Sequence, residues 1–180
     1  EKFFAEYERQ LLKASGVHVS LKIASVIWNR VQSTPKNLVL YRDSLKALRT
    51  LKGLGLKLGI ISNMGLELHQ IIAQLGLTEL IDFGITSSEA GTAKPHPPIF
   101  QMALRRAEVS NSEAIHVGDD YEGDILGARG IGIHSVLINR EGKIDAPSNC
   151  PMITSLEDIA PYVKSYGGAQ VLKTRPENRH

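Results

Sequence analysis

The chain has 180 residues, of which 42% are hydrophobic and 22% charged, and 21 basic against 19 acidic side chains give it a formal net charge of +2. This length permits one ordinary domain with a small appendage and argues against a long multidomain architecture. No apolar stretch approaches the roughly 18 to 20 residues of a membrane-spanning helix. The charge balance also lacks the basic excess typical of a protein that binds a nucleic-acid backbone. We therefore expect neither a membrane span nor a nucleic-acid partner.

The cysteine content and the start of the chain give two further expectations. Cys150 is the single cysteine, so neither an internal disulfide nor a cysteine metal cluster can form, which favours the reducing cytoplasm. The chain begins at Glu1 and its first methionine is Met64, without the basic and apolar segments of a secretory signal. We expect that the natural polypeptide has a segment upstream of Glu1, so that this chain is truncated.

The first 34 residues predict two helices. Apolar residues between positions 2 and 14 recur at the spacing of one helical face. Ser20 is placed to cap a second helix that runs through Val31 and ends before Pro35. The two segments together predict a helical pair.

From Leu38 onward, short apolar runs alternate with helical patterns, which is typical of an α/β fold with a parallel sheet. Asp43 is expected to cap the first of these helices, and Ser155 to cap the last. In chain order the pattern predicts a helix to Gly53, a strand over 56–61, a helix over 68–75, a strand over 83–87, a helix over 97–107, a strand over 114–117, a helix over 123–130, a strand over 133–138, and a helix from 155 to the Gly167–Gly168 pair. We expect residues 1–34, 35–168 and 169–180 to form an appendage, a core and a polar tail.

Ligands of open parallel sheets bind beyond the carboxyl ends of the strands, so the polar residues after each strand matter most. Ser62 and Asn63 follow the strand over 56–61, and a helix is expected to begin near Gly65. A hydroxyl, an amide and the N–H groups of that helix would then converge on one anion. The alternative is that Ser62 or Asn63 only caps the helix.

Lys94 stands directly before Pro95, at the beginning of the helix over 97–107. The residue before a proline favours an extended backbone, which projects the ammonium group from the strand-end side. The alternative is an ordinary solvated lysine.

An acidic cluster follows the strand over 114–117. Residues 113–124 hold five acids and neither lysine nor arginine, and they include Asp119, Asp120 and Asp124. Two carboxylates about 4 Å apart repel by roughly 4 kcal/mol at an effective dielectric constant near 20, so a cation is needed where two of them meet. Mg²⁺ prefers such oxygen ligands. The alternative is that Asp119 or Asp120 only caps a helix.

The three sites occur in a fixed order, with 32 residues from Ser62 to Lys94 and 25 from Lys94 to Asp119. ISN at 61–63, AKPHPPIF at 93–100 and HVGDDYEGDILGARGIG at 116–132 resemble the second, third and fourth motifs of the haloacid dehalogenase-like hydrolases. The resemblance is to the branch whose helical cap is inserted early in the chain, and the run over 83–139 is similar to its domain-containing-protein-3 type. It implies a Rossmann-like, three-layer parallel-sheet core, with residues 1–34 as part of the cap.

The resemblance also implies a role for each candidate residue. Ser62 would hydrogen-bond the transferred phosphoryl group, with Asn63 beside it, and Lys94 would neutralise negative charge there. Asp119 would bind Mg²⁺.

Two further acids of the same cluster have implied roles. Asp124 would orient Lys94 or a metal-bound water. Asp120 competes with Asp124 as the second acid at the metal.

One motif of the family is absent from this chain. The family reaction uses an aspartate nucleophile in a DxD element on the first strand, upstream of the cap, and no DxD occurs in these 180 residues. We expect this strand to lie upstream of Glu1. Without it, the middle of the sheet would expose backbone N–H and C=O groups. The 180-residue chain alone is expected to bind Mg²⁺ weakly and to hydrolyse no phosphate ester.

The expected function is that of a Mg²⁺-dependent phosphatase of a small phosphorylated metabolite, acting through an aspartyl phosphate. Two alternatives stay open: a 2-haloacid dehalogenase, which needs the aspartate but not Mg²⁺, and a noncatalytic binding or regulatory module with the same fold. His69, His116 and His134 are interpreted as structural histidines, because their spacing matches no local metal motif. The sequence predicts neither the substrate nor the oligomeric state.

Overall fold

The computed structural model describes residues 2–33, 38–65, 67–144 and 146–170. The chain divides into two compact units, Glu1–Leu38 and Val39–His180. The expected boundary at 34/35 and most of the expected tail lie outside the described residues. The helices and strands are α1 (Lys2–Ala14), α2 (Leu21–Ser33), α3 (Ser44–Gly53), β1 (Gly59–Ser62), α4 (Leu68–Gln74), β2 (Phe83–Thr86), α5 (Ser87–Ala90), α6 (Pro97–Ala107), a 3₁₀ turn (Asn111–Glu113), β3 (Ile115–Gly118), a π-helical segment (Tyr121–Leu126), α7 (Gly127–Arg129), β4 (His134–Ile138), β5 (Met152–Ile153), a 3₁₀ turn (Leu156–Asp158) and α8 (Ile159–Gln170).

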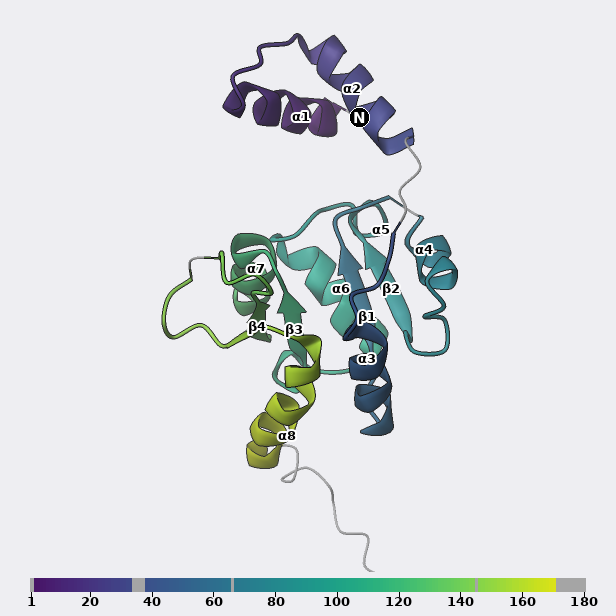
Figure 1. Cartoon of the computed structure of the whole chain (residues 1–180), viewed down its shortest axis with the longest axis vertical. Coiled ribbons are helices and arrows are strands. Elements are labelled where there is room, and N and C mark those ends of the chain that lie inside the picture. Colours follow the sequence, from purple (N-terminus) through teal and green to yellow (C-terminus); the bar gives the residue numbers. More distant parts are fainter. Residues whose placement is uncertain (1, 34–37, 66, 145, 171–180) are drawn as a thin grey trace, which may run out of the picture. The chain divides into compact units, whose positions relative to one another are not determined.

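The first unit is the predicted helical pair, α1 and α2 (Figure 1). The helices pack through two buried alanines, Ala5 and Ala24, and through the rings of Phe4 and Trp28, which stack with centroids 4.9 Å apart. The Ser20 hydroxyl accepts a hydrogen bond from the Ile23 N–H at 3.3 Å, so the predicted cap of α2 is confirmed. None of the described helices is both long enough and apolar enough to cross a membrane.

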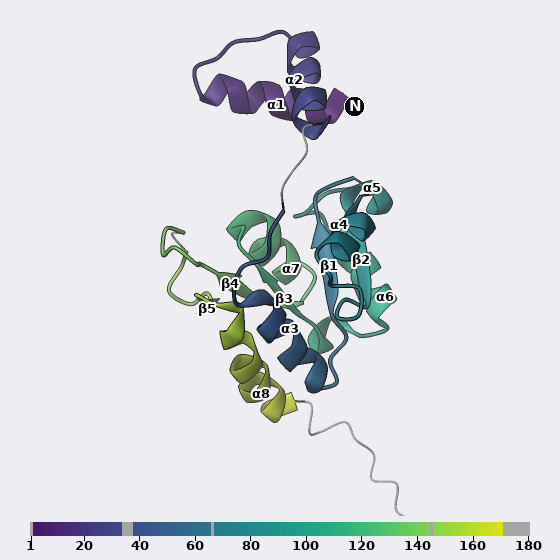
Figure 2. The same cartoon turned by 45° about the vertical axis from the view of Figure 1, so that its right-hand side comes forward.

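The second unit is an α/β fold whose strands are all parallel, as predicted (Figures 1 and 2). The strands form two separate ladders. In one ladder β1 pairs with β2, with Ile61 beside Ile85. In the other β3 pairs with β4, with Val117 beside Val136, and β4 pairs with β5. Within the described residues, β1 and β3 have no strand hydrogen-bonded between them.

Successive side chains of each strand point to opposite faces, and helices pack on both faces. The unit therefore has three layers, with the strands between two layers of helices. On β1, Ile60 packs with α4 and Ile61 packs with α6. On β3, Ile115 and Val117 pack with α3 and α8, which lie side by side in both views (Figures 1 and 2). The face opposite α3 and α8 is covered by α6 and α7, whose core residues include the fully buried Phe100.

The predicted cap of α3 is wrong. Asp43 precedes α3, but its backbone is helical (φ −82°, ψ −16°) and its side chain makes no capping hydrogen bond, whereas a capping residue normally has an extended backbone. Its carboxylate instead accepts hydrogen bonds from Arg140 Nη1 at 2.7 Å, Ser155 Oγ at 2.9 Å and the Leu156 N–H at 2.8 Å. Asp43 therefore ties the start of α3 to the segments after β4 and β5.

Other element boundaries differ from the prediction for local reasons. The helix expected over 123–130 begins earlier, as the π-helical segment, because the Asp120 carboxylate accepts hydrogen bonds from the N–H groups of Glu122 and Gly123. The helix expected near Gly65 begins only at Leu68. Strand β5 was not predicted, since two residues are too short to show a pattern. Helix α8 continues to Gln170, past the glycine pair expected to end it.

Candidate functional site

The candidate site lies at the carboxyl ends of β1 and β3. Ser62 is the last residue of β1, and Asp119 directly follows Gly118, the last residue of β3. Lys94 is in the loop between α5 and α6. Each of the three motifs thus has a residue at the end of a strand or in a loop: Ser62, Lys94 and Asp119.

The Lys94 ammonium group bridges the two ladders. Its Nζ donates to Asp124 Oδ1 at 2.6 Å and to the carbonyl oxygen of Ile61 at 3.2 Å. Asp124 belongs to the segment after β3, and Ile61 directly precedes Ser62 on β1. The structure thus brings together two of the predicted residues, Lys94 and Asp124, and places their charges beside the end of β1.

Asn63 holds the backbone of Lys94. Its Oδ1 accepts a hydrogen bond from the Lys94 N–H at 2.7 Å, and its Nδ2 donates to the Lys94 carbonyl at 3.1 Å. This pairing fixes the start of the lysine side chain relative to the end of β1. The sequence analysis did not predict this contact, because it joins two loops 31 residues apart.

The Asp124 carboxylate is almost fully buried and is nevertheless charged. Its side chain is 4% exposed. Burial raises the pKa of this carboxyl group, but hydrogen bonds from His116 and Lys94 outweigh that effect and lower the pKa to about 2. The Asp120 N–H also donates to Asp124 Oδ2, at 3.2 Å. Asp124 is therefore a fixed negative charge at neutral pH, and it positions Lys94.

His116 is a site residue that the sequence analysis missed. It was interpreted as structural, yet its Nε2 lies 2.9 Å from Asp124 Oδ1, the same oxygen that Lys94 contacts. The available signal was strand parity. Residues 116 and 118 of β3 lie on one face, and 115 and 117 pack on the other, in the α3 and α8 core. His116 and Gly118 therefore share the face of β3 that Asp124 contacts.

The absence of a side chain at Gly118 leaves space for the Asp124 carboxylate. A Cβ built at Gly118 would lie 2.2 Å from the Asp124 Cγ, far inside van der Waals contact. A Cβ at Gly127 would lie 2.8 Å from a Phe100 ring carbon and 2.9 Å from the backbone of Pro95. The two glycines therefore let the segment after β3 close on the lysine loop.

Ser62 and Asp119 are the predicted residues that keep their side chains available. The Ser62 hydroxyl and the exposed Asp119 carboxylate make no hydrogen bond or ion pair among the described residues. The helix expected near Gly65 begins only at Leu68, so its N–H groups follow Ser62 later in the chain than predicted.

These residues provide only part of the ligand set of a magnesium site. Asp119 offers an available carboxylate, and one or two carboxylates together with substrate phosphate commonly hold Mg²⁺. Asp120 uses Oδ1 to cap the π-helical segment, and Asp124 is paired with Lys94. In the described part of the chain there is no cluster of three or more His, Cys, Asp or Glu side chains that would hold a metal. The donor set fits Asp119 as one ligand, with the others supplied from elsewhere.

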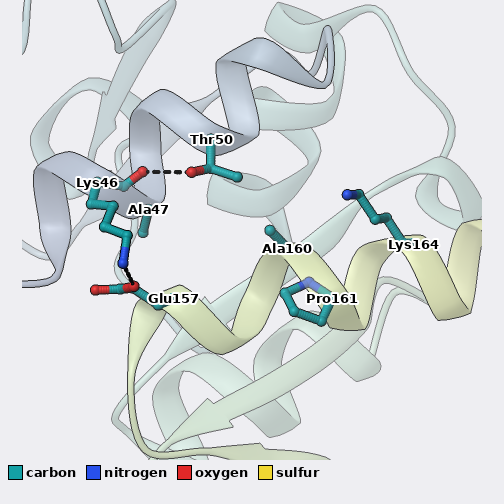
Figure 3. A pocket seen from close by; sticks show the side chains of 7 residues that line it. All are labelled: Lys46, Ala47, Thr50, Glu157, Ala160, Pro161 and Lys164. Carbon is teal, nitrogen blue, oxygen red and sulfur yellow. Dashed lines mark hydrogen bonds and ion pairs between the residues drawn. The ribbon is translucent and has the colours of Figure 1, made fainter.

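A groove between α3 and α8 is a separate feature (Figure 3). Lys46 and Glu157 form an ion pair across one end of it, and the Thr50 hydroxyl donates to the Lys46 carbonyl at 2.8 Å. The groove is lined by Lys46, Ala47, Thr50, Glu157, Ala160, Pro161 and Lys164. None of these is a predicted site residue, so the groove does not belong to the candidate site.

Comparisons with known proteins identify relatives of this chain. The family described as haloacid dehalogenase-like hydrolase matches residues 1–138. The chain is 36% identical over 157 residues to haloacid dehalogenase-like hydrolase domain-containing protein 3 of Xenopus laevis, an alignment that covers 84% of this chain and 64% of that protein. It is 35% identical over 131 residues to glyceraldehyde 3-phosphate phosphatase of Methanocaldococcus jannaschii, covering 69% of this chain and 57% of that protein.

A solved structure has the same fold. The 2-haloacid dehalogenase of Pseudomonas syringae pv. Tomato DC3000 superposes with a TM-score of 0.65 at 26% identity, covering 90% of this chain and 70% of that one. The chain spans less than two thirds of the length of the curated relatives it matches, 64% and 57% for the two named above. The family match, the parallel α/β fold and the residues at the strand ends agree: the chain belongs to the haloacid dehalogenase-like hydrolases.

Proposed function

We propose that this hydrolase is a Mg²⁺-dependent phosphatase that acts on a small phosphorylated metabolite. The observation that carries the proposal is the Lys94 side chain, which is 14% exposed and whose ammonium group is held between Asp124 and the carbonyl of Ile61, the residue before Ser62. A cation fixed in a partly buried site attracts an anionic group more strongly than a solvated lysine does. Phosphoryl transfer needs this kind of charge compensation.

Each residue has one task in the proposed reaction. Ser62 donates a hydrogen bond to a phosphoryl oxygen, and Lys94 neutralises the charge of the phosphoryl group. Asp124 positions Lys94 through their ion pair. Asp119 would hold Mg²⁺, which would supply positive charge to compensate the phosphoryl oxygens.

The proposed nucleophile is an aspartate on a strand outside residues 1–180 that pairs with β1 and β3. The absence of a strand hydrogen-bonded between β1 and β3 within the described residues supports this placement. The aspartate oxygen attacks phosphorus, the P–O bond to the metabolite breaks, and the released alcohol takes a proton from an acid. Water then cleaves the aspartyl phosphate and releases inorganic phosphate, which regenerates the carboxylate.

A phosphatase is favoured over a dehalogenase by the Asp119 carboxylate, which has no partner in the described part of the chain and suits a divalent cation. The relative from M. jannaschii is named glyceraldehyde 3-phosphate phosphatase. The neighbour from P. syringae is named a dehalogenase, which keeps that reaction as the second candidate.

The test uses a chain extended upstream to include an aspartate-bearing first strand, with residues 1–180 alone as the control. p-Nitrophenyl phosphate, glyceraldehyde 3-phosphate and 2-chloropropionate are offered with Mg²⁺ and with EDTA. We expect the extended chain to hydrolyse phosphate esters only with Mg²⁺, and the 180-residue chain to hydrolyse none. Metal-independent chloride release would support the dehalogenase, and the absence of both reactions would support a noncatalytic module.

A further inference from the structure

His116 shares one carboxylate oxygen with the lysine of the site. Its Nε2 and the Lys94 Nζ both contact Asp124 Oδ1, at 2.9 Å and 2.6 Å. The three side chains are 12%, 14% and 4% exposed, so water competes little for these contacts. A carboxylate oxygen that accepts from two donors inside the protein is held against rotation by both.

The chemistry of the pair fixes the proton on His116. Asp124 Oδ1 accepts from the Lys94 ammonium at 2.6 Å and Oδ2 accepts from the Asp120 N–H at 3.2 Å, so both carboxylate oxygens already act as acceptors. The hydrogen of the contact must therefore be on His116 Nε2. The imidazole ring is fixed in turn by the edge of Phe100, with ring centroids 5.3 Å apart and planes at 88°.

We propose that His116 is a positioning residue for the Lys94 ammonium, acting through the shared oxygen of Asp124. The proposal rests on the proposed function, because the position of the Lys94 ammonium affects activity only if the site binds an anionic substrate. Removing the Nε2–H donor leaves Asp124 Oδ1 with Lys94 as its one remaining side-chain donor. The carboxylate then gains freedom to rotate and holds the Lys94 ammonium less firmly. The contribution of Lys94 to anion binding is weakened.

The alternative is that this hydrogen bond only satisfies the polar nitrogen of the largely buried His116 ring. His134 offers a matched comparison, since it also lies on a strand, contacts aromatic rings and makes one hydrogen bond, to the Tyr162 hydroxyl at 2.5 Å. Its hydrogen-bond partner lies on α8, outside the candidate site. A substitution at His134 therefore reports the purely structural effect of losing a strand histidine.

The experiment measures the ¹H–¹⁵N signal of the Lys94 ammonium in the 180-residue chain, assigned by its loss in Lys94→Met. In the parent protein we expect a resolved signal with slow hydrogen exchange, and a His116 ring protonated on Nε2. In His116→Phe we expect ammonium exchange at least about tenfold faster. In His116→Gln, whose amide N–H replaces Nε2–H, we expect most of the protection to return.

The control His134→Phe is expected to lose a similar amount of thermal stability and to leave the Lys94 signal unchanged. Unaltered exchange in His116→Phe, equal effects of the two phenylalanine variants, or no resolved ammonium signal in the parent would each overturn the proposal. These readouts need neither substrate nor turnover. A failure of the proposed phosphatase reaction is therefore seen separately, in the hydrolysis assay.

Discussion

Lys94 and Asp124 form a nearly buried ion pair, with Nζ 2.6 Å from Oδ1, that joins the loop before α6 to the segment after β3. The same ammonium group donates to the Ile61 carbonyl of β1. The pair thus connects the β1–β2 ladder to the β3–β4–β5 ladder at the end where the candidate site lies.

Replacing Asp124 by asparagine should strongly destabilise the protein. The change leaves Lys94, whose side chain is 14% exposed, without its counter-ion, and breaking such a pair costs about 3 kcal/mol. We expect the urea-unfolding free energy of Asp124→Asn to fall by roughly this amount. The exposed pair of Glu141 and Lys143 is the control, and Glu141→Gln should cost less than about 1 kcal/mol.

The double variant Lys94→Met/Asp124→Asn isolates the interaction itself. Since both charges are then removed, its loss of stability should be smaller than the sum of the two single losses. Strict additivity would show that the two groups do not interact in solution.

Adding one methyl group at Gly118 should disrupt the site. The Cβ would lie 2.2 Å from Asp124 Oδ2, and that carboxylate is held in place by other groups. We expect Gly118→Ala to lower the unfolding free energy by about 1 to 3 kcal/mol and to weaken the Lys94 contact. Gly53→Ala is the matched variant, because a Cβ at Gly53 meets nothing within 4 Å, and it should leave stability unchanged or slightly raised.

Asp43 should make stability fall in acid. The hydrogen bond from Arg140 is the main cause that lowers the pKa of this carboxyl group from 3.8 to about 2. A depressed folded-state pKa means that the stabilisation is complete above about pH 4, the unfolded value, and is lost as the pH falls toward 2.

Asparagine at position 43 cannot titrate, so Asp43→Asn should be less stable than the parent at pH 6 by roughly 2 kcal/mol. The difference should shrink between pH 4 and pH 2.5, measured as urea-unfolding free energies at each pH. A difference that stays constant with pH would mean that Asp43 is not held in its charged form by Arg140.

The sequence predicted the parts of this molecule that depend on local pattern. The helical pair, the parallel α/β core and most elements follow from periodicity and from caps such as Ser20, and the order of the motifs predicted the family. What it could not predict depends on contacts between distant segments. Examples are the turn of the Asp43 carboxylate toward Arg140, the Asn63 amide on the backbone of Lys94, and the separation of the strands into two ladders.

His116 shows where more could have been inferred. Strand parity and the glycine at 118 were both visible in the sequence, but the charge that faces the ring comes from Asp124, eight residues later, and is placed by a π-helical segment. Periodicity predicts an ordinary helix there, so the direction of the Asp124 side chain was not accessible.

The most direct test of the account is phosphate-ester hydrolysis by the upstream-extended chain carrying Lys94→Ala or Asp119→Ala. Lys57→Ala is the control, since Lys57 pairs with Glu108 at an exposed surface. Because each site residue compensates charge on the transferred phosphoryl group, we expect kcat/KM for p-nitrophenyl phosphate in Mg²⁺ to fall at least about 100-fold in both variants and to stay unchanged in the control. Activity within about threefold of the parent in either site variant would contradict the claim that these residues form one phosphoryl-transfer site.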